Sequence, residues 1–152
     1  MKSLISIIIL SITLTNCGFN PIYGSKNSNF EILEIKNKNE NKNSFAIEKM
    51  IVSLSNQDAI KKIKLEIDYE EIITTVLKDS KGDPSKKKLS INVDLKVKNE
   101  KNNVLVNKNF SEEFNYSVQS DKFNMAQYED NIINNLSNKI SNDIILLLGT
   151  LK

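Results

Sequence analysis

The stretch KLSINVDLKVK, residues 88–98, alternates polar and apolar side chains without a break. Successive side chains of an extended chain point to opposite faces, so this segment predicts a strand that is apolar on one face only. Residues 63–77 and 104–118 repeat the pattern. In the first of these segments, Glu70 and Glu71 interrupt the alternation, which predicts a bulge or bend. Three such strands in succession predict an antiparallel sheet with one face in water and one face that must be covered.

Two segments have the helical spacing needed to cover that face. Residues 44–56 carry apolar side chains on one helical face, and Ser44 is the predicted N-cap. Residues 121–148 repeat apolar side chains at steps of three and four, opposite Asn, Ser and Lys. A further strand is expected over residues 29–36. The sequence therefore predicts an α+β fold of order β-α-β-β-β-α, with two helices packed on one face of a four-stranded, mostly antiparallel sheet.

The first residues of the chain have the layout of a secretory signal, with one lysine followed by an uncharged apolar run from Leu4 to Leu14. This run is shorter than the roughly 20 residues that cross a bilayer. Directly after it, Leu14-Thr15-Asn16-Cys17 resembles a bacterial lipobox, although Asn16 stands where Gly, Ala or Ser is usual. We therefore expect a lipoprotein signal peptide over residues 1–16, a lipid-anchored tether over 17–28 and a single domain over 29–152.

Composition argues against an enzyme. The chain has no histidine, and its single cysteine is Cys17. Without these side chains the usual general base, thiol nucleophile and commonest metal ligand are absent. All 21 basic residues are lysines, which weakens any case for reading nucleic-acid bases through arginine. We expect no metal, no nucleic acid and no cofactor other than N-acyl and S-diacylglycerol lipid on Cys17.

A hydrolase built on Ser/Lys or carboxylate chemistry is the competing enzymatic hypothesis. The sequence contains no G-x-S-x-G nucleophile elbow to support it. The carboxylates that could form acid/base pairs belong to strands and are interpreted as solvated strand faces. They are Asp68, Glu70, Glu71, Glu112 and Glu113.

Cys17-Gly18-Phe19-Asn20-Pro21-Ile22-Tyr23-Gly24 resembles the start of mature LptE proteins, the lipopolysaccharide-assembly lipoproteins. There a Cys-Gly-Phe-x-Pro-Leu-Tyr-Gly opening recurs, above all in alphaproteobacterial members, and Ile22 replaces the usual leucine. The element order and the last helix extend the resemblance over most of the mature chain. It implies an outer-membrane lipoprotein on the periplasmic side that binds and plugs the LptD β-barrel. Such a protein assists barrel assembly and the delivery of lipopolysaccharide to the outer leaflet.

An alternative is an auxiliary lipoprotein of an ABC-type lipid transport system, which is also a small lipid-anchored α+β domain. The pattern of strands and helices does not separate the two hypotheses. The opening from Cys17 to Pro21 favours the first, and Gly18 favours the outer membrane, since aspartate after the cysteine is typical of inner-membrane retention.

Two groups of residues are candidate binding sites. Phe19, Pro21, Ile22 and Tyr23 are predicted to dock on the barrel wall or on the domain's own sheet, or else to stiffen the tether through Pro21. The second group lies in the predicted loop over residues 78–88, where lysines could meet the phosphates of lipopolysaccharide. Its members are Lys81, Lys86, Lys87 and Lys88. An ordinary solvated hairpin loop, or a guard against edge-to-edge aggregation, stays open as the other interpretation.

Overall fold

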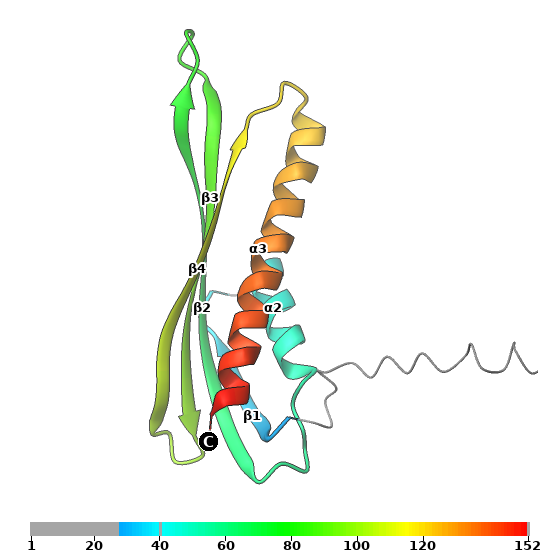
Figure 1. Ribbon diagram of the computed structural model, residues 1–152, viewed down its shortest axis with the longest axis vertical. Helices are drawn as coiled ribbons and strands as arrows, with labels where there is room; N and C mark the ends of the chain where they lie inside the picture. The colour runs from blue at the N-terminus through cyan, green and yellow to red at the C-terminus, as the bar shows by residue number, and fades with distance from the viewer. Residues whose placement is uncertain (1–27, 40, 152) are drawn as a thin grey trace, which may run out of the picture.

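The computed structural model describes residues 28–39 and 41–151. The predicted anchor and docking residues lie outside this part of the chain: Cys17, Phe19, Pro21, Ile22 and Tyr23. The elements follow one another as β1 (Phe30–Asn37), α2 (Lys42–Val52), β2 (Lys61–Lys78), β3 (Pro84–Asn99), β4 (Val104–Ser117) and α3 (Lys122–Thr150). Both helices lie on one face of a four-stranded sheet (Figure 1), so the predicted α+β fold is confirmed.

The strands are arranged in the order β1-β2-β3-β4. β1 and β2 are parallel because α2 carries the chain back between them, whereas β2, β3 and β4 are joined by two antiparallel hairpins. The register places Leu65, Val97 and Val106 side by side across three strands. Because paired residues share a face, the apolar sets of the strands coincide on the side where the helices lie.

The core is one layer of side chains between the sheet and the helices. Ile140, Ile144 and Leu148 of α3 recur at four-residue steps, and each is 0% exposed. From α2, Ile47 and Ile51 are buried in the same cluster. Each fully buried side chain of this size stabilises the fold by about 1.5–3 kcal/mol. α3 therefore covers most of the apolar sheet face, and α2 adds to the core beside β1.

Helix α2 begins earlier than the sequence predicts. Asn41, not Ser44, is the N-cap, and its side-chain oxygen accepts hydrogen bonds from the backbone N–H groups of Asn43 at 2.9 Å and Ser44 at 2.8 Å. Ser44 lies at the third helical position, where its hydroxyl accepts from the Asn41 N–H at 2.9 Å. This reciprocal capping box satisfies donors that a helix start otherwise leaves unpaired. A serine in place of the usual Glu or Gln hid the box in the sequence.

The interruption predicted at Glu70 and Glu71 is also wrong. β2 continues through both residues, and Glu71 pairs with Ile91 in unbroken register. Its carboxylate faces the first turn of α2 and accepts hydrogen bonds from the Tyr69 hydroxyl at 3.2 Å and the Asn43 amide at 3.1 Å. A polar residue thus occupies a helix-side position without a change of phase. The register shifts of β2 come later, between Thr75 and Lys78.

Two leucines of α3 test the role of this helix as the cover of the sheet. Leu148 is 0% exposed and Leu146 is 54% exposed. Leu148→Ala is expected to lower the free energy of unfolding by about 2–5 kcal/mol, since it leaves a cavity in a close-packed layer. Leu146→Ala is the matched control and should cost well under half as much. Chemical denaturation of both variants measures the difference, and equal losses would contradict the assignment of the core.

Candidate binding surface of the distal hairpin

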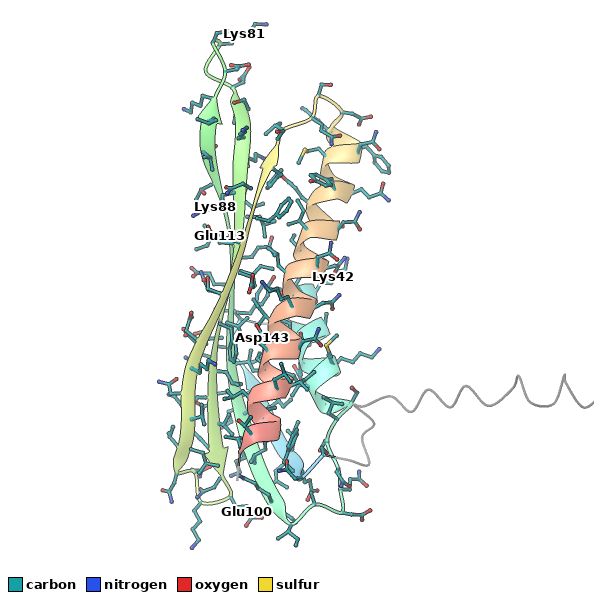
Figure 2. The ribbon with its side chains drawn as sticks, viewed as in Figure 1. Lys42, Lys81, Lys88, Glu100, Glu113 and Asp143 are labelled. Atoms are coloured by element: carbon teal, nitrogen blue, oxygen red, sulfur yellow. The ribbon has the colours of Figure 1, made fainter. Side chains whose placement is uncertain are left out.

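The end of β2 and the start of β3 form a hairpin whose tip extends beyond the first turn of α3. Lys81 lies at this tip (Figures 1 and 2). Residues 72–88 are called the distal hairpin below. The Asp79 carboxylate organises the turn by accepting hydrogen bonds from the N–H groups of Lys81 and Asp83, both at 2.9 Å. Gly82 has φ +90°, a conformation that disfavours other residues. The loop is therefore a defined turn that presents the Lys81 side chain at one end of the molecule.

The structure corrects the predicted lysine cluster, because the loop is shorter than expected and Lys86, Lys87 and Lys88 belong to β3. Their side chains alternate between the two faces of the sheet. Lys87 forms an ion pair with Glu129 at 3.3 Å, and Lys88 forms one with Glu113 at 3.0 Å.

Lys81 and Lys86 form no ion pair with any described residue. Of the four predicted lysines, these two retain a charge that is free to meet an anion.

Lys87 belongs to a polar contact that joins the base of the distal hairpin to α3. The Glu129 carboxylate accepts a hydrogen bond from the Tyr116 hydroxyl at 2.5 Å and also faces the Lys87 ammonium. Tyr116 is 4% exposed and packs edge-on against Tyr128, with ring centroids 6.1 Å apart. Burial, together with the hydrogen bond to Glu129, raises the pKa of Tyr116 well above its ordinary range.

A second polar contact links α3 to β4 further along the helix. The Lys139 ammonium donates to the Glu112 carboxylate at 2.7 Å, and this hydrogen bond raises the pKa of Lys139. Glu112, Glu113 and Glu71 are therefore each paired with a neighbouring side chain.

Apolar side chains of the distal hairpin are exposed on both faces of the sheet. Ile73 is 42% exposed and lies on the helix side, where Leu89 separates it from Phe114, which is 44% exposed. Ile72 points the other way, and Leu77 beyond the register shift is 51% exposed. The tip of this hairpin around Lys81 projects past α3, whereas its base at Lys88 lies beside that helix (Figure 2). The result is an uncovered apolar surface next to a lysine-bearing tip, a combination that fits an amphiphile with anionic groups.

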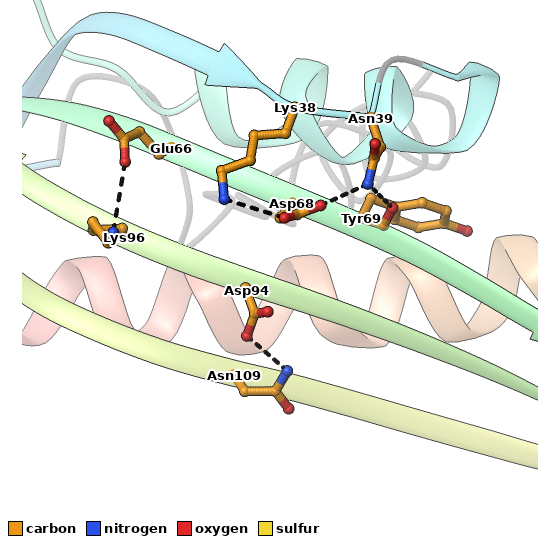
Figure 3. A network of polar contacts seen from close by, with 8 residues as sticks. All are labelled: Lys38, Asn39, Glu66, Asp68, Tyr69, Asp94, Lys96 and Asn109. Carbon is orange, nitrogen blue, oxygen red and sulfur yellow. Dashed lines mark hydrogen bonds and ion pairs between the residues drawn. The ribbon is translucent and has the colours of Figure 1, made fainter.

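The sheet face opposite the helices, called the outer face, carries rows of paired polar side chains (Figure 3). Asp68 accepts from Lys38 at 3.2 Å and from Asn39 at 2.7 Å, while Asp94, its neighbour across the strands, accepts from Asn109 at 2.9 Å. These partners offset the repulsion that two directly opposite carboxylates would otherwise feel.

Glu66, on the same face, pairs with Lys98 and Lys96. The hydrogen bond from Lys98 lowers the pKa of Glu66 despite some desolvation. Among the described residues, no group of three or more His, Cys, Asp or Glu side chains could hold a metal ion. The outer face is thus an open surface of paired polar side chains.

Comparison with known proteins places the fold. No protein-family profile matches the sequence, and no curated protein matches it. The rare lipoprotein B structure from Shewanella oneidensis superposes with a TM-score of 0.61 at 10% identity, covering 78% of this chain and 93% of that one. An uncharacterized lipoprotein B from Nitrosomonas europaea gives 0.64 at 10% identity, covering 86% and 88%. This chain has their fold.

A minor lipoprotein from Acinetobacter baumannii is similar too, with a TM-score of 0.53 at 11% identity, covering 75% of this chain and 90% of that one. At identities this low, the similarity shows a shared fold and nothing about function. Within the described residues, no helix is both long and apolar enough to pass through a membrane.

Sequence reasoning missed the apolar part of the distal hairpin, although a signal was present. Ile72-Ile73 and Val76-Leu77 are adjacent apolar pairs in a strand that otherwise alternates. A pair of this kind places apolar side chains on both faces at once, which a sheet covered on one side does not need. Such doublets at the end of a strand indicate a surface that is apolar on two sides.

The shifted tyrosine supplies a prediction on pH. An unfolded tyrosine ionises near pH 10, whereas folded Tyr116 retains its proton at higher pH. Above about pH 10 the unfolded state therefore binds fewer protons than the folded state, so stability falls as pH rises. In the Tyr116→Phe variant this fall should be shallower, and one high-pH step should disappear from the phenolate absorbance. If the step that disappears lay near pH 10 instead, Tyr116 would ionise as an ordinary tyrosine does.

Proposed function

We propose that this chain is a lipoprotein anchored through Cys17 on the periplasmic side of the outer membrane. There it binds and plugs an LptD-type β-barrel, assists assembly of that barrel and helps to deliver lipopolysaccharide to the outer leaflet. The role is one of binding, without catalysis. Support comes from the opening Cys17-Gly18-Phe19 with Pro21 behind an apolar leader, and from a fold shared with solved lipoproteins.

The distal hairpin is the observation that carries the lipopolysaccharide part of the proposal. Lipopolysaccharide joins phosphates to acyl chains, so a surface that binds it needs cations beside apolar area. Lys81 and Lys86 supply ammonium groups free of ion pairs with the described residues. Ile72 and Leu77 supply exposed apolar side chains a few residues away. Lysine acts here as a point charge, without the bidentate geometry of arginine.

The polar outer face of the sheet is consistent with the proposed position of the chain inside a barrel. The inside of an outer-membrane barrel is polar, because lipid-facing and lumen-facing residues alternate along its strands. A plug must therefore present polar side chains to the wall. Asn92, Asn109 and Ser111 lie on the outer face among the charged rows, and the Ser111 hydroxyl is 2.7 Å from the Asn92 side chain. Side chains of this type donate and accept hydrogen bonds without a net charge.

A pull-down tests the partner. The full chain with a C-terminal tag is recovered from outer-membrane extracts in mild detergent. We expect one large β-barrel of the lipopolysaccharide translocon at a one-to-one ratio, and Cys17→Ser should remove the chain from the membrane fraction. Recovery of ABC-transporter components, or of the chain alone, would overturn the plug and leave the fold unaffected.

The lysines are tested by binding to purified lipopolysaccharide. The double variant Lys81→Ala with Lys86→Ala should bind about 30-fold more weakly, since each lysine near an anionic lipid surface contributes about 1 kcal/mol. Lys101→Ala with Lys108→Ala makes the same charge change away from the distal hairpin and should bind as the parent does. Fluorescence titration at fixed ionic strength measures both. Equal losses in the two variants would mean that net charge, not this hairpin, drives binding.

A further inference from the structure

The two helices enclose an apolar groove on their solvent side. It has a volume of about 410 Å³ and is lined by Met50, Ser53 and Leu54 at the end of α2 and by Asn142, Ile145 and Leu146 of α3. Leu146 is 54% exposed. None of the lining residues is charged. Three other hollows of the described surface are lined mainly by lysine, carboxylate and amide side chains, so this groove differs from them in kind.

The N-terminal segment enters the described structure at one end of this groove. The Asn56 amide donates to the Ser28 carbonyl at 3.1 Å, and the Asn29 amide donates to the Leu151 carbonyl at 3.4 Å. Asn56 follows the groove residue Leu54 by two positions, and Leu151 lies just past the end of α3. The chain that precedes Ser28 therefore starts beside the C-terminal ends of both helices.

We propose that the residues from Phe19 to Tyr23 dock in this groove of their own domain. Tyr23 is five residues before Ser28 and can lie at most about 18 Å from it, and nine residues give Phe19 a reach of about 32 Å. The 11 residues of α2 span about 16 Å. The segment is therefore long enough to run along the groove beside α2.

The chemistry of the segment matches that of the groove. Residues 17–24 contain no charged side chain, and three of them, Phe19, Ile22 and Tyr23, are large and apolar or aromatic. Ser53 and Asn142 offer polar groups to an extended backbone. Pro21 limits the conformations that docking must freeze. Because the segment is covalently attached, its effective concentration is in the millimolar range, so a weak intrinsic affinity suffices.

The proposal does not rest on the proposed function, and its test uses the purified full chain alone. Tyr23 is replaced by the photoreactive amino acid p-benzoylphenylalanine, which keeps an aromatic ring at this position. After illumination, the crosslinked residues are mapped by mass spectrometry. We expect crosslinks to Met50, Leu54, Ile145 or Leu146, about tenfold more often than to β1, because docking holds residue 23 against the groove, whereas an undocked segment attached at Ser28 reaches β1 as readily.

Matched charge substitutions sharpen the result. Leu146→Asp in the groove, or Ile22→Asp in the segment, should lower groove crosslinking about tenfold, because a carboxylate opposes burial in an uncharged site. Leu33→Asp is the control: Leu33 is 44% exposed, lies on β1 near Ser28 and should leave the crosslinks unchanged.

Crosslinks spread over the surface nearest Ser28 would overturn the proposal, as would crosslinks between two copies of the chain. A normal pull-down of the barrel beside a negative crosslinking result would separate this failure from a failure of the proposed function.

Discussion

The packing of α3 against the sheet is the contact on which the rest of the structure depends. Three long strands with one apolar face cannot remain in water uncovered, and α3 supplies most of the cover. Hydrophobic attraction has no direction of its own, so directional polar contacts add to the close packing in setting the position of the helix along the strands. The Tyr116–Glu129 and Glu112–Lys139 contacts lie at two points along α3 and fix its position relative to β4.

Covering one face leaves the other open to solvent. Exposed ion pairs contribute little to stability, so the rows on the outer face add little to the stability of the fold. The helix side is covered incompletely at the base of the distal hairpin. There α3 buries Leu89, but Ile73 and Phe114 on either side of it remain partly in water. One packing arrangement thus generates both candidate surfaces, the polar face and the apolar hairpin.

The period of the apolar residues was enough to predict the architecture, because strands and helices with one apolar face pack in few ways. It was insufficient for features that depend on contacts between elements. Glu71 is polar and faces the helix side because Tyr69 and Asn43 complete its hydrogen bonds, and no local pattern contains that information. The N-cap at Asn41 was not predicted because its partner in the capping box is Ser44, where Glu or Gln is usual.

The lysines of β3 are a second feature that the sequence pattern alone could not predict. Three consecutive lysines suggest one cluster, but the strand separates them onto two faces and two of them find carboxylates far away in sequence. Pairing of this kind is decided by the sheet register and by the path of α3. The candidate site could therefore be located to a region from the sequence, whereas its two free charges could be identified only from the fold.

The length of β2 sets the distance between the two ends of the domain. Its 18 residues span about 60 Å, more than the 40–45 Å of a bilayer with its headgroups. Ser28 lies near the end of α3, and the tip of the hairpin lies at the opposite end (Figure 2). Side chains alternate along both strands, so without a further bulge this spacing changes by two residues in each strand, a step of about 7 Å. The distance between the end of the domain at Ser28 and the lysine tip is consequently set in discrete units by strand geometry.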